Sequence, residues 1–166
     1  MRISRRTAVG LLGLSADAYG KPAAQHRFVG VWHLVSCERK FEDGRVDFPY
    51  GEKPVGRITY DKAGRMSAQL MRPGRRSTIP PGVSLTAGGA SAEEIRDAVN
   101  GFIAYYGTFD VDEARQTVIH TVQACLIPSW VGTDLKRTYR FYSNRLVLKA
   151  ASTDSALELI WEREAD

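Results

Sequence analysis

Polar side chains capable of acid–base or anion-binding chemistry alternate with apolar residues in the second half of the chain. His120 stands between Val118 and Val122, and Arg137 and Tyr139 alternate with apolar neighbours in a later segment. Alternate residues of a β-strand point to the same face of the sheet, so we expect these three side chains to face the interior. Imidazole exchanges protons near neutral pH, and guanidinium binds carboxylates. The pattern therefore predicts an apolar interior that recognises an acidic group.

The same alternation predicts the rest of the ligand site. The residues expected to contact a ligand are Tyr60, Gln69, Tyr105, His120, Trp130, Arg137 and Tyr139. The strand that contains Gln69 is ambiguous, because either Met66, Ala68 and Leu70 or Ser67, Gln69 and Met71 could face inward. Trp130 lies in a Pro-Ser-Trp loop, where it could close over a ligand or simply pack beneath the neighbouring loop. A second interpretation is structural: Arg137 pairs with Glu38, and His120 satisfies a tyrosine hydroxyl within a filled core, because unpaired buried charges are costly.

These residues require a sheet to position them, and period-two patterning dominates beyond residue 27. The predicted strands are 29–40, 54–60, 65–71, 102–111, 116–126, 134–142, 145–150 and 156–163. Ser91 and Glu94 form a capping box that predicts one helix over 91–100, in the connection between the third and fourth strands. About eight strands with one short helix predict an all-β, antiparallel up-and-down barrel.

The connection lengths predict which end of the barrel is open. Connections after the second, fourth and sixth strands are tight turns, whereas those after the first, third, fifth and seventh are longer. Successive connections of a meander alternate between its two ends, so one end is closed and the other carries the larger loops. This is the arrangement expected of a cup with a ligand inside.

The sequence resembles the bacterial and fungal lipocalin-like domain family over roughly residues 28–163. Gly30-Val31-Trp32 matches the G-x-W of the lipocalin first strand. The other matching segments are Leu34-Val35-Ser36, Pro54-Val55-Gly56, 64–72, 105–109, Val118-Ile119-His120, 128–133 and 159–163. The resemblance implies that Trp32 closes the base of the barrel and that Arg163 stacks on it. It implies little about a reaction.

The first eighteen residues predict export. Arg5-Arg6 follows Ser4 as in a twin-arginine signal, a short apolar run follows, and Ala16-Asp17-Ala18 matches a cleavage site. We therefore expect an export signal over 1–18, a linker over 19–27 and the barrel over 28–166, in a periplasmic or secreted protein. The alternative is a cytoplasmic protein with an amphipathic or disordered N-terminus.

Composition excludes several other classes. The formal net charge is +4, but residues 1–18 carry +2 of it, so we expect no nucleic-acid partner. No apolar stretch is long enough for a membrane anchor. The three histidines are scattered and no cysteine pair has zinc spacing, so neither a metal nor another cofactor is predicted. Cys37 and Cys125 have the parity opposite Trp32 and His120, which predicts free thiols outside the barrel.

Two functions fit these residues, and a third possibility opposes both. The first is a carrier of a small hydrophobic molecule that bears a carboxylate or enolate. The second is a cofactor-free isomerase, cyclase or dehydratase with His120 as acid or base, Tyr105 or Tyr139 as proton donor and Arg137 holding an enolate. The third is a filled, purely structural barrel. A ligand site is expected to have a volume of at least a few hundred Å³.

Overall fold

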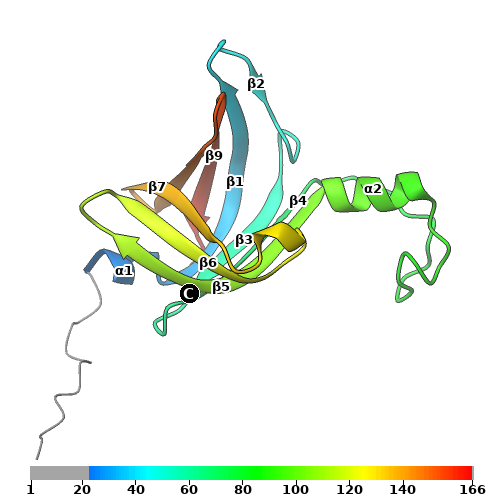
Figure 1. The fold of residues 1–166 in the computed structure, drawn as a ribbon, viewed down its shortest axis with the longest axis horizontal. Coiled ribbons are helices and arrows are strands. Elements are labelled where there is room, and N and C mark those ends of the chain that lie inside the picture. The colour runs from blue at the N-terminus through cyan, green and yellow to red at the C-terminus, as the bar shows by residue number, and fades with distance from the viewer. Residues whose placement is uncertain (1–22, 166) are drawn as a thin grey trace, which may run out of the picture.

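The computed structural model describes residues 23–165, so the predicted export signal lies outside the described residues (Figure 1). Its strands are β1 (Gly30–Phe41), β2 (Val46–Asp47), β3 (Val55–Tyr60), β4 (Arg65–Met71), β5 (Phe102–Asp112), β6 (Thr117–Cys125), β7 (Asp134–Tyr142), β8 (Arg145–Ala151) and β9 (Ser155–Arg163). The helices are α1 (Ala23–Phe28), α2 (Ala92–Asn100) and the 3₁₀ turn η1 (Pro128–Trp130). None of the helices in this range is long and apolar enough to cross a membrane.

The strands form one antiparallel sheet that closes into a barrel. Their order is β2-β1-β3-β4-β5-β6-β7-β8-β9, and β1 also pairs with β9. Eight strands therefore make the barrel, as predicted, while the short β2 extends its edge beside the far end of β1. Tight turns join β3 to β4, β5 to β6 and β7 to β8 at the base, and the longer connections gather at the other end, the mouth.

Helix α1 was not predicted, whereas α2 overlaps the predicted helix over 91–100. Because the short β2 adds one strand to the count, α2 lies between β4 and β5 of the observed strands. Its N-cap is Ser91, whose side chain accepts a hydrogen bond from the Glu94 backbone amide as predicted. Helix α1 occupies most of the segment expected to be a linker, and Phe28 at its end is fully buried in the barrel.

Helix α2 and the preceding loop form an arm that projects from the barrel (Figure 1). No residue of α2 is buried. Polar contacts hold the arm together: Arg72 pairs with Asp97, and Glu94 accepts hydrogen bonds from the Ser77 and Thr78 hydroxyls at 2.6 and 2.9 Å. The arm therefore contributes little to the barrel core.

A β-bulge changes the parity of β1 halfway along its length. Leu34 pairs with Trp161 and Ser36 pairs with Ile160, so Val35 is the additional residue. Beyond the bulge, Cys37 is fully buried, whereas Glu38 bonds to Lys40 on the outside. Glu38, which the structural interpretation placed inside the barrel beside Arg137, therefore points outward, because one inserted residue reverses every later side chain.

A second bulge changes the parity of β6. Tyr106 pairs with Ala124 and Gly107 pairs with Val122, which leaves Gln123 as the additional residue. A Cβ atom on Gly107 would lie 2.0 Å from the Thr121 carbonyl oxygen, so this close approach requires glycine. After the bulge, Cys125 shares the inward face with Tyr105, its partner across the ladder. Both thiols are free, but the predicted outward parity of Cys37 and Cys125 is wrong.

Candidate ligand-binding site

An indole and a guanidinium seal the base of the barrel, as the resemblance implied. The Arg163 guanidinium carbon lies 4.1 Å from the centroid of the Trp32 ring, and the two residues are directly paired between β9 and β1. Trp32 Nε1 donates to the Phe28 carbonyl at 2.8 Å, and Arg163 Nη1 donates to the Val29 carbonyl at 2.6 Å. Gly30 has φ +136° and a Cβ atom there would lie 2.5 Å from Arg163 Nη1, so glycine makes room for the cation.

Aromatic rings fill the lower half of the lumen. Phe28 contacts Tyr60, Tyr139 and Phe141 with ring centroids 4.9–5.3 Å apart, and Tyr60 contacts Phe109 at 4.7 Å. Phe28, Tyr60 and Phe109 are at most 1% exposed. The base half of the barrel is therefore a packed core and not a ligand site.

A buried hydrogen-bonded triad lies above this core. His120 is fully buried, with Nε2 2.9 Å from the Tyr60 hydroxyl and Nδ1 3.0 Å from the Tyr105 hydroxyl. Burial holds the pKa of His120 well below its usual value, and the charge of Arg137 lowers it further. Burial also raises the pKa values of both tyrosines. The triad is therefore neutral over the physiological pH range.

A small cavity of about 50 Å³ remains in the lumen, between the aromatic base and the mouth. Its polar wall consists of Tyr50, Tyr105, Trp130, Arg137 and Trp161, and aliphatic side chains form the remainder. The enclosed volume is smaller than the few hundred Å³ expected of a complete ligand site.

Arg137 faces the triad and does not form the predicted ion pair with the Glu38 carboxylate. The positive charge of its guanidinium lowers the Tyr105 pKa, which opposes the larger effect of burial. Glu38 instead bonds to Lys40, with 3.4 Å between Oε2 and Nζ. Within residues 23–165, Arg137 makes no salt bridge. The predicted Glu38–Arg137 pair is therefore wrong, because the bulge in β1 turns Glu38 outward.

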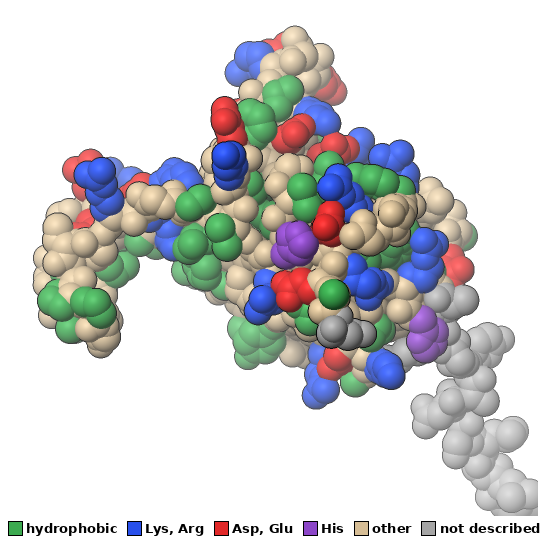
Figure 2. Space-filling view, turned by 180° about the vertical axis from the view of Figure 1, so that it is seen from behind, with side chains coloured by type: hydrophobic (Ala, Val, Ile, Leu, Met, Phe, Trp, Pro, Cys, Tyr) green, Lys and Arg blue, Asp and Glu red, His purple; other side chains and the backbone are tan. Residues whose placement is uncertain are grey.

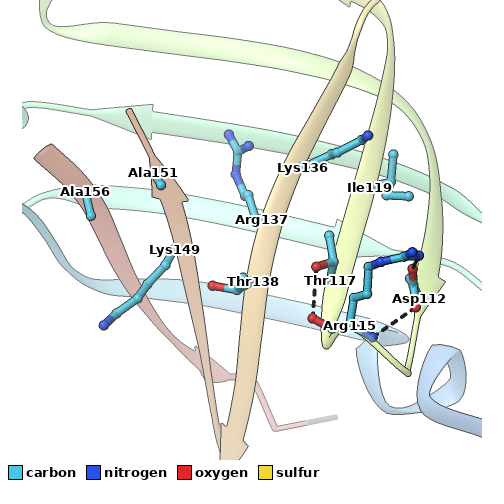
Figure 3. Close-up of a pocket in the computed structure, with 10 residues that line it drawn as sticks. All are labelled: Asp112, Arg115, Thr117, Ile119, Lys136, Arg137, Thr138, Lys149, Ala151 and Ala156. Atoms are coloured by element: carbon cyan, nitrogen blue, oxygen red, sulfur yellow. Dashed lines mark hydrogen bonds and ion pairs between the residues drawn. The ribbon is translucent and has the colours of Figure 1, made fainter. Parts of the chain in front are cut away.

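The barrel wall is notched between β7 and β8, beside Arg137. The β7–β8 ladder ends at the pair Thr138 and Lys149, so residues 134–137 of β7 have no partner on β8. Figure 3 shows the two strands diverging beyond this point, with Arg137 in the gap. No residue of β7 is buried, although alternate residues face inward. The lumen is therefore accessible from the side near its mouth.

A hollow of about 380 Å³ lies in this notch and adjoins the cavity. The hollow and the cavity share Trp130, Arg137 and Leu157 as wall residues. The hollow and the cavity are therefore neighbours, with the Arg137 guanidinium in the wall of both.

A larger hollow of about 750 Å³ lies outside the barrel and also reaches Arg137 (Figure 3). Its wall contains polar residues such as Lys136, Thr138 and Lys149, and the ion pair between Arg115 and Asp112 closes one end. Figure 2 shows basic and acidic side chains interleaved on the face turned away from Figure 1, without a large patch of either sign. The wall of the outer hollow carries charged side chains of both signs, whereas aliphatic and aromatic side chains dominate the wall of the inner cavity.

The predicted site residues are only partly brought together. Tyr105, Trp130 and Arg137 line the cavity, while His120 and Tyr60 stand behind Tyr105. Gln69 lies outside the barrel, beside Ser67 and Tyr106 in a surface hollow, because Met66, Ala68 and Leu70 are the buried residues of β4. Tyr139 packs against the aromatic base and does not line the cavity.

Sequence reasoning missed two residues that line the cavity. Trp161 lines the cavity, and its buried indole N–H has no hydrogen-bond partner among the described residues. Tyr50 enters from the connection between β2 and β3, which no periodic pattern could have revealed. Burial, followed by the neighbouring Cys37 thiol, raises the pKa of Tyr50 to about 12. The alternation in the last strand could have indicated Trp161, which shares the inward face with Leu159.

The described residues hold no group of three or more His, Cys, Asp and Glu side chains that could bind a metal ion. Every polar side chain on the cavity wall is instead a phenol, an indole or a guanidinium. This set of groups suits recognition of a ligand oxygen.

Comparisons with known proteins identify the family. Residues 29–164 match the model of a family described as the lipocalin-like domain. The chain is 34% identical over 89 residues, 50% of this chain and 77% of the relative, to the "4'-hydroxy-3'-methoxypropiophenone carrier protein ppsC" of Aspergillus oryzae (strain ATCC 42149 / RIB 40). A crystal structure of a mutant of the fluorescent protein UnaG is similar with a TM-score of 0.41 and 10% identity, covering 85% of this chain and 99% of that one. The chain belongs to the lipocalin-like domain family.

Proposed function

We propose that this protein is an exported carrier of one small, largely apolar molecule that bears a carboxylate or enolate oxygen. The ligand occupies the inner cavity and the adjoining notch, with its apolar part among the aliphatic side chains and its oxygen at Arg137. The observation that carries the proposal is the position of Arg137, which stands without a carboxylate partner among the described residues where the cavity and the notch meet. A ligand anion would supply the missing countercharge.

The relative from Aspergillus oryzae supports a carrier role, because its name describes a carrier of an aromatic ketone. Such a ligand is larger than the inner cavity of about 50 Å³, so binding requires Tyr50 and Trp130 to move outward. Both residues lie outside the strands, Tyr50 in a connection and Trp130 in η1, and both are only partly buried. Segments of this kind rearrange at lower cost than paired strands.

In the enzymatic alternative, His120 can reach a ligand only through Tyr105, which lines the cavity. His120 is fully buried and does not line the cavity. Both of its ring nitrogens form hydrogen bonds with tyrosine hydroxyls, those of Tyr60 and Tyr105. A His120→Gln substitution would therefore change affinity modestly in a carrier. In an enzyme the same substitution would abolish turnover while affinity is largely kept.

Titration calorimetry with 4'-hydroxy-3'-methoxypropiophenone tests the carrier proposal, together with native mass spectrometry of protein purified from its host. We expect a co-purifying small molecule, and we expect Arg137→Met to weaken binding of the phenolate form by about 10-fold or more, as for loss of a charged hydrogen bond. Arg140→Met is the matched control, because Arg140 lies on the same strand but stacks over Tyr142 on the outside. Equal affinities for the two variants would refute the assigned role of Arg137.

Export is proposed from the N-terminal sequence alone. Fractionation of the host cells should place the mature chain in the periplasm or medium, and Arg5→Lys with Arg6→Lys should retain it in the cytoplasm. Unprocessed, cytoplasmic wild-type protein would overturn this part of the proposal without affecting the ligand site.

A further inference from the structure

The positions of the hydrogen atoms in the buried triad follow from which hydrogen-bond acceptors are available to each hydroxyl. Among the described residues, the Tyr60 hydroxyl has a single hydrogen-bond partner, His120 Nε2. If Tyr60 accepted from Nε2–H, its own buried proton would have no acceptor, which is unfavourable. Tyr60 therefore donates to Nε2. A neutral imidazole carries one N–H, so the proton of His120 resides on Nδ1.

This tautomer determines what Tyr105 offers to the cavity. His120 Nδ1–H donates to the Tyr105 hydroxyl oxygen over 3.0 Å, and Arg137 lies beside Tyr105 on the cavity wall. The oxygen therefore serves as an acceptor toward the protein. The hydroxyl proton of Tyr105 remains available, and Tyr105 lines the cavity. The hydrogen bond from His120 and the positive charge of Arg137 polarise the phenol and strengthen it as a donor.

A second donor on the cavity wall has no partner among the described residues. Trp161 is 1% exposed, and its indole Nε1–H makes no hydrogen bond within this part of the chain. The Trp32 indole, by contrast, donates to the Phe28 carbonyl at the base. Indole nitrogen and guanidinium can only donate, so neither Trp161 nor Arg137 can satisfy the other.

We propose that the cavity is a hydrogen-bond donor site that selects ligands by an acceptor oxygen, a carbonyl or a carboxylate, held by Tyr105, Trp161 and Arg137. The inference rests on the proposed carrier function and adds Trp161 as a binding residue. Among the described residues, no carboxylate, amide or imidazole side chain lines the cavity, so a ligand that can only donate finds acceptors solely in the tyrosine hydroxyls. Discrimination arises because an apolar ligand of equal shape leaves buried donors unpaired.

Three probes of similar size test the selectivity by titration calorimetry: propylbenzene, propiophenone and 3-phenylpropanoate. Propiophenone differs from propylbenzene by one carbonyl oxygen, and we expect it to bind about 10-fold more tightly. Tyr105→Phe and Trp161→Phe should each reduce this preference to about 3-fold or less, while the affinity for propylbenzene is kept. Arg137→Met should weaken 3-phenylpropanoate more than propiophenone, which separates the carboxylate from the neutral carbonyl.

Tyr139→Phe is the matched control, because it removes a phenol hydroxyl from the same barrel at a position away from the cavity. It should leave the preference unchanged. Since Trp161→Phe could fail to fold, infrared spectroscopy of ¹³C=O-labelled propiophenone on the wild-type protein gives an independent measurement. We expect the carbonyl stretch of the bound ketone to shift to lower frequency than in hexane, as hydrogen bonding weakens the C=O bond.

The outcomes separate the two proposals. Equal binding of propylbenzene and propiophenone, or a carbonyl stretch unchanged from hexane, overturns the donor site and leaves the carrier function standing. Absence of binding for all three probes overturns both. A preference for the ketone that survives Tyr105→Phe and Trp161→Phe overturns the assignment of these residues.

Discussion

The base and the mouth of the barrel contain similar aromatic residues, but these residues are tightly packed at the base and only partly buried at the mouth. At the base, Trp32, Tyr60 and Phe109 are each 1% exposed. At the mouth, Tyr50 and Trp130 are only partly buried and surround open space. Tight turns keep the strands paired down to the base, whereas longer connections and the β7–β8 notch leave the mouth loosely joined. One end of the barrel therefore provides stability and the other provides space.

Truncating one tryptophan at each end tests this comparison most strongly. Trp32→Ala should lower the free energy of unfolding by about 3–5 kcal/mol, because it empties a packed site and removes the stacking partner of Arg163. Trp130→Ala at the mouth should cost about 1 kcal/mol. Urea unfolding followed by circular dichroism measures both values. Similar losses for the two variants would show that the mouth is packed as tightly as the base.

Glycine substitutions make the same comparison at the backbone. Gly30→Ala should cost about 2–3 kcal/mol, because φ is +136° and the new Cβ atom would displace Arg163. Gly132→Ala, near the mouth, has φ +80° but open space around it, so we expect about 1 kcal/mol from backbone strain alone. Thermal unfolding midpoints rank the two variants, and a larger loss for Gly132→Ala would contradict the assignment.

Acidification should lower the free energy of unfolding through His120, which lies between the packed base and the mouth. Its pKa is depressed by burial in the folded protein, so the unfolded chain binds the proton first. The stability due to neutral His120 is therefore complete above about pH 6.5 and falls by about 1.4 kcal/mol per pH unit below it, until the folded pKa is reached.

Urea titrations between pH 7 and pH 4.5 measure this slope. His120→Gln should remove it, whereas His33→Gln, at an exposed position on β1, should retain it. A wild-type slope equal to that of His120→Gln would show that His120 is not the group responsible.

Thiol labelling gives the smallest effect and requires no loss of stability. Burial raises the pKa of Cys37 to about 12, so this thiol should resist Ellman's reagent at pH 8. Cys125 is partly exposed at the mouth and should react. Native protein should therefore release one equivalent of thionitrobenzoate and urea-unfolded protein two. Cys125→Ser should abolish the native reaction, and a persistent signal in that variant would show that Cys37 is accessible.

The strand pattern was predictable because alternation and turn residues are local signals. All eight predicted strands are present within about two residues of their expected ends, and Ser91 caps α2 as expected. The contact between Trp32 and Arg163 was also predictable, since a closed meander brings the first and last strands together. Side-chain direction beyond Val35 and Gln123 was not predictable, because a bulge depends on the partner strand and leaves no periodic mark of its own.

The sequence by itself determined the barrel, its closed base and the inward position of Tyr105, His120 and Arg137, since each depends on period-two alternation and connection length. Tertiary structure alone decided that Glu38 turns away from Arg137, that Cys37 turns inward and that the indole of Trp161 has no acceptor among the described residues. The physical reason is register. Which polar groups meet across a barrel depends on how its strands slide and bulge against one another, and that is a property of the closed sheet.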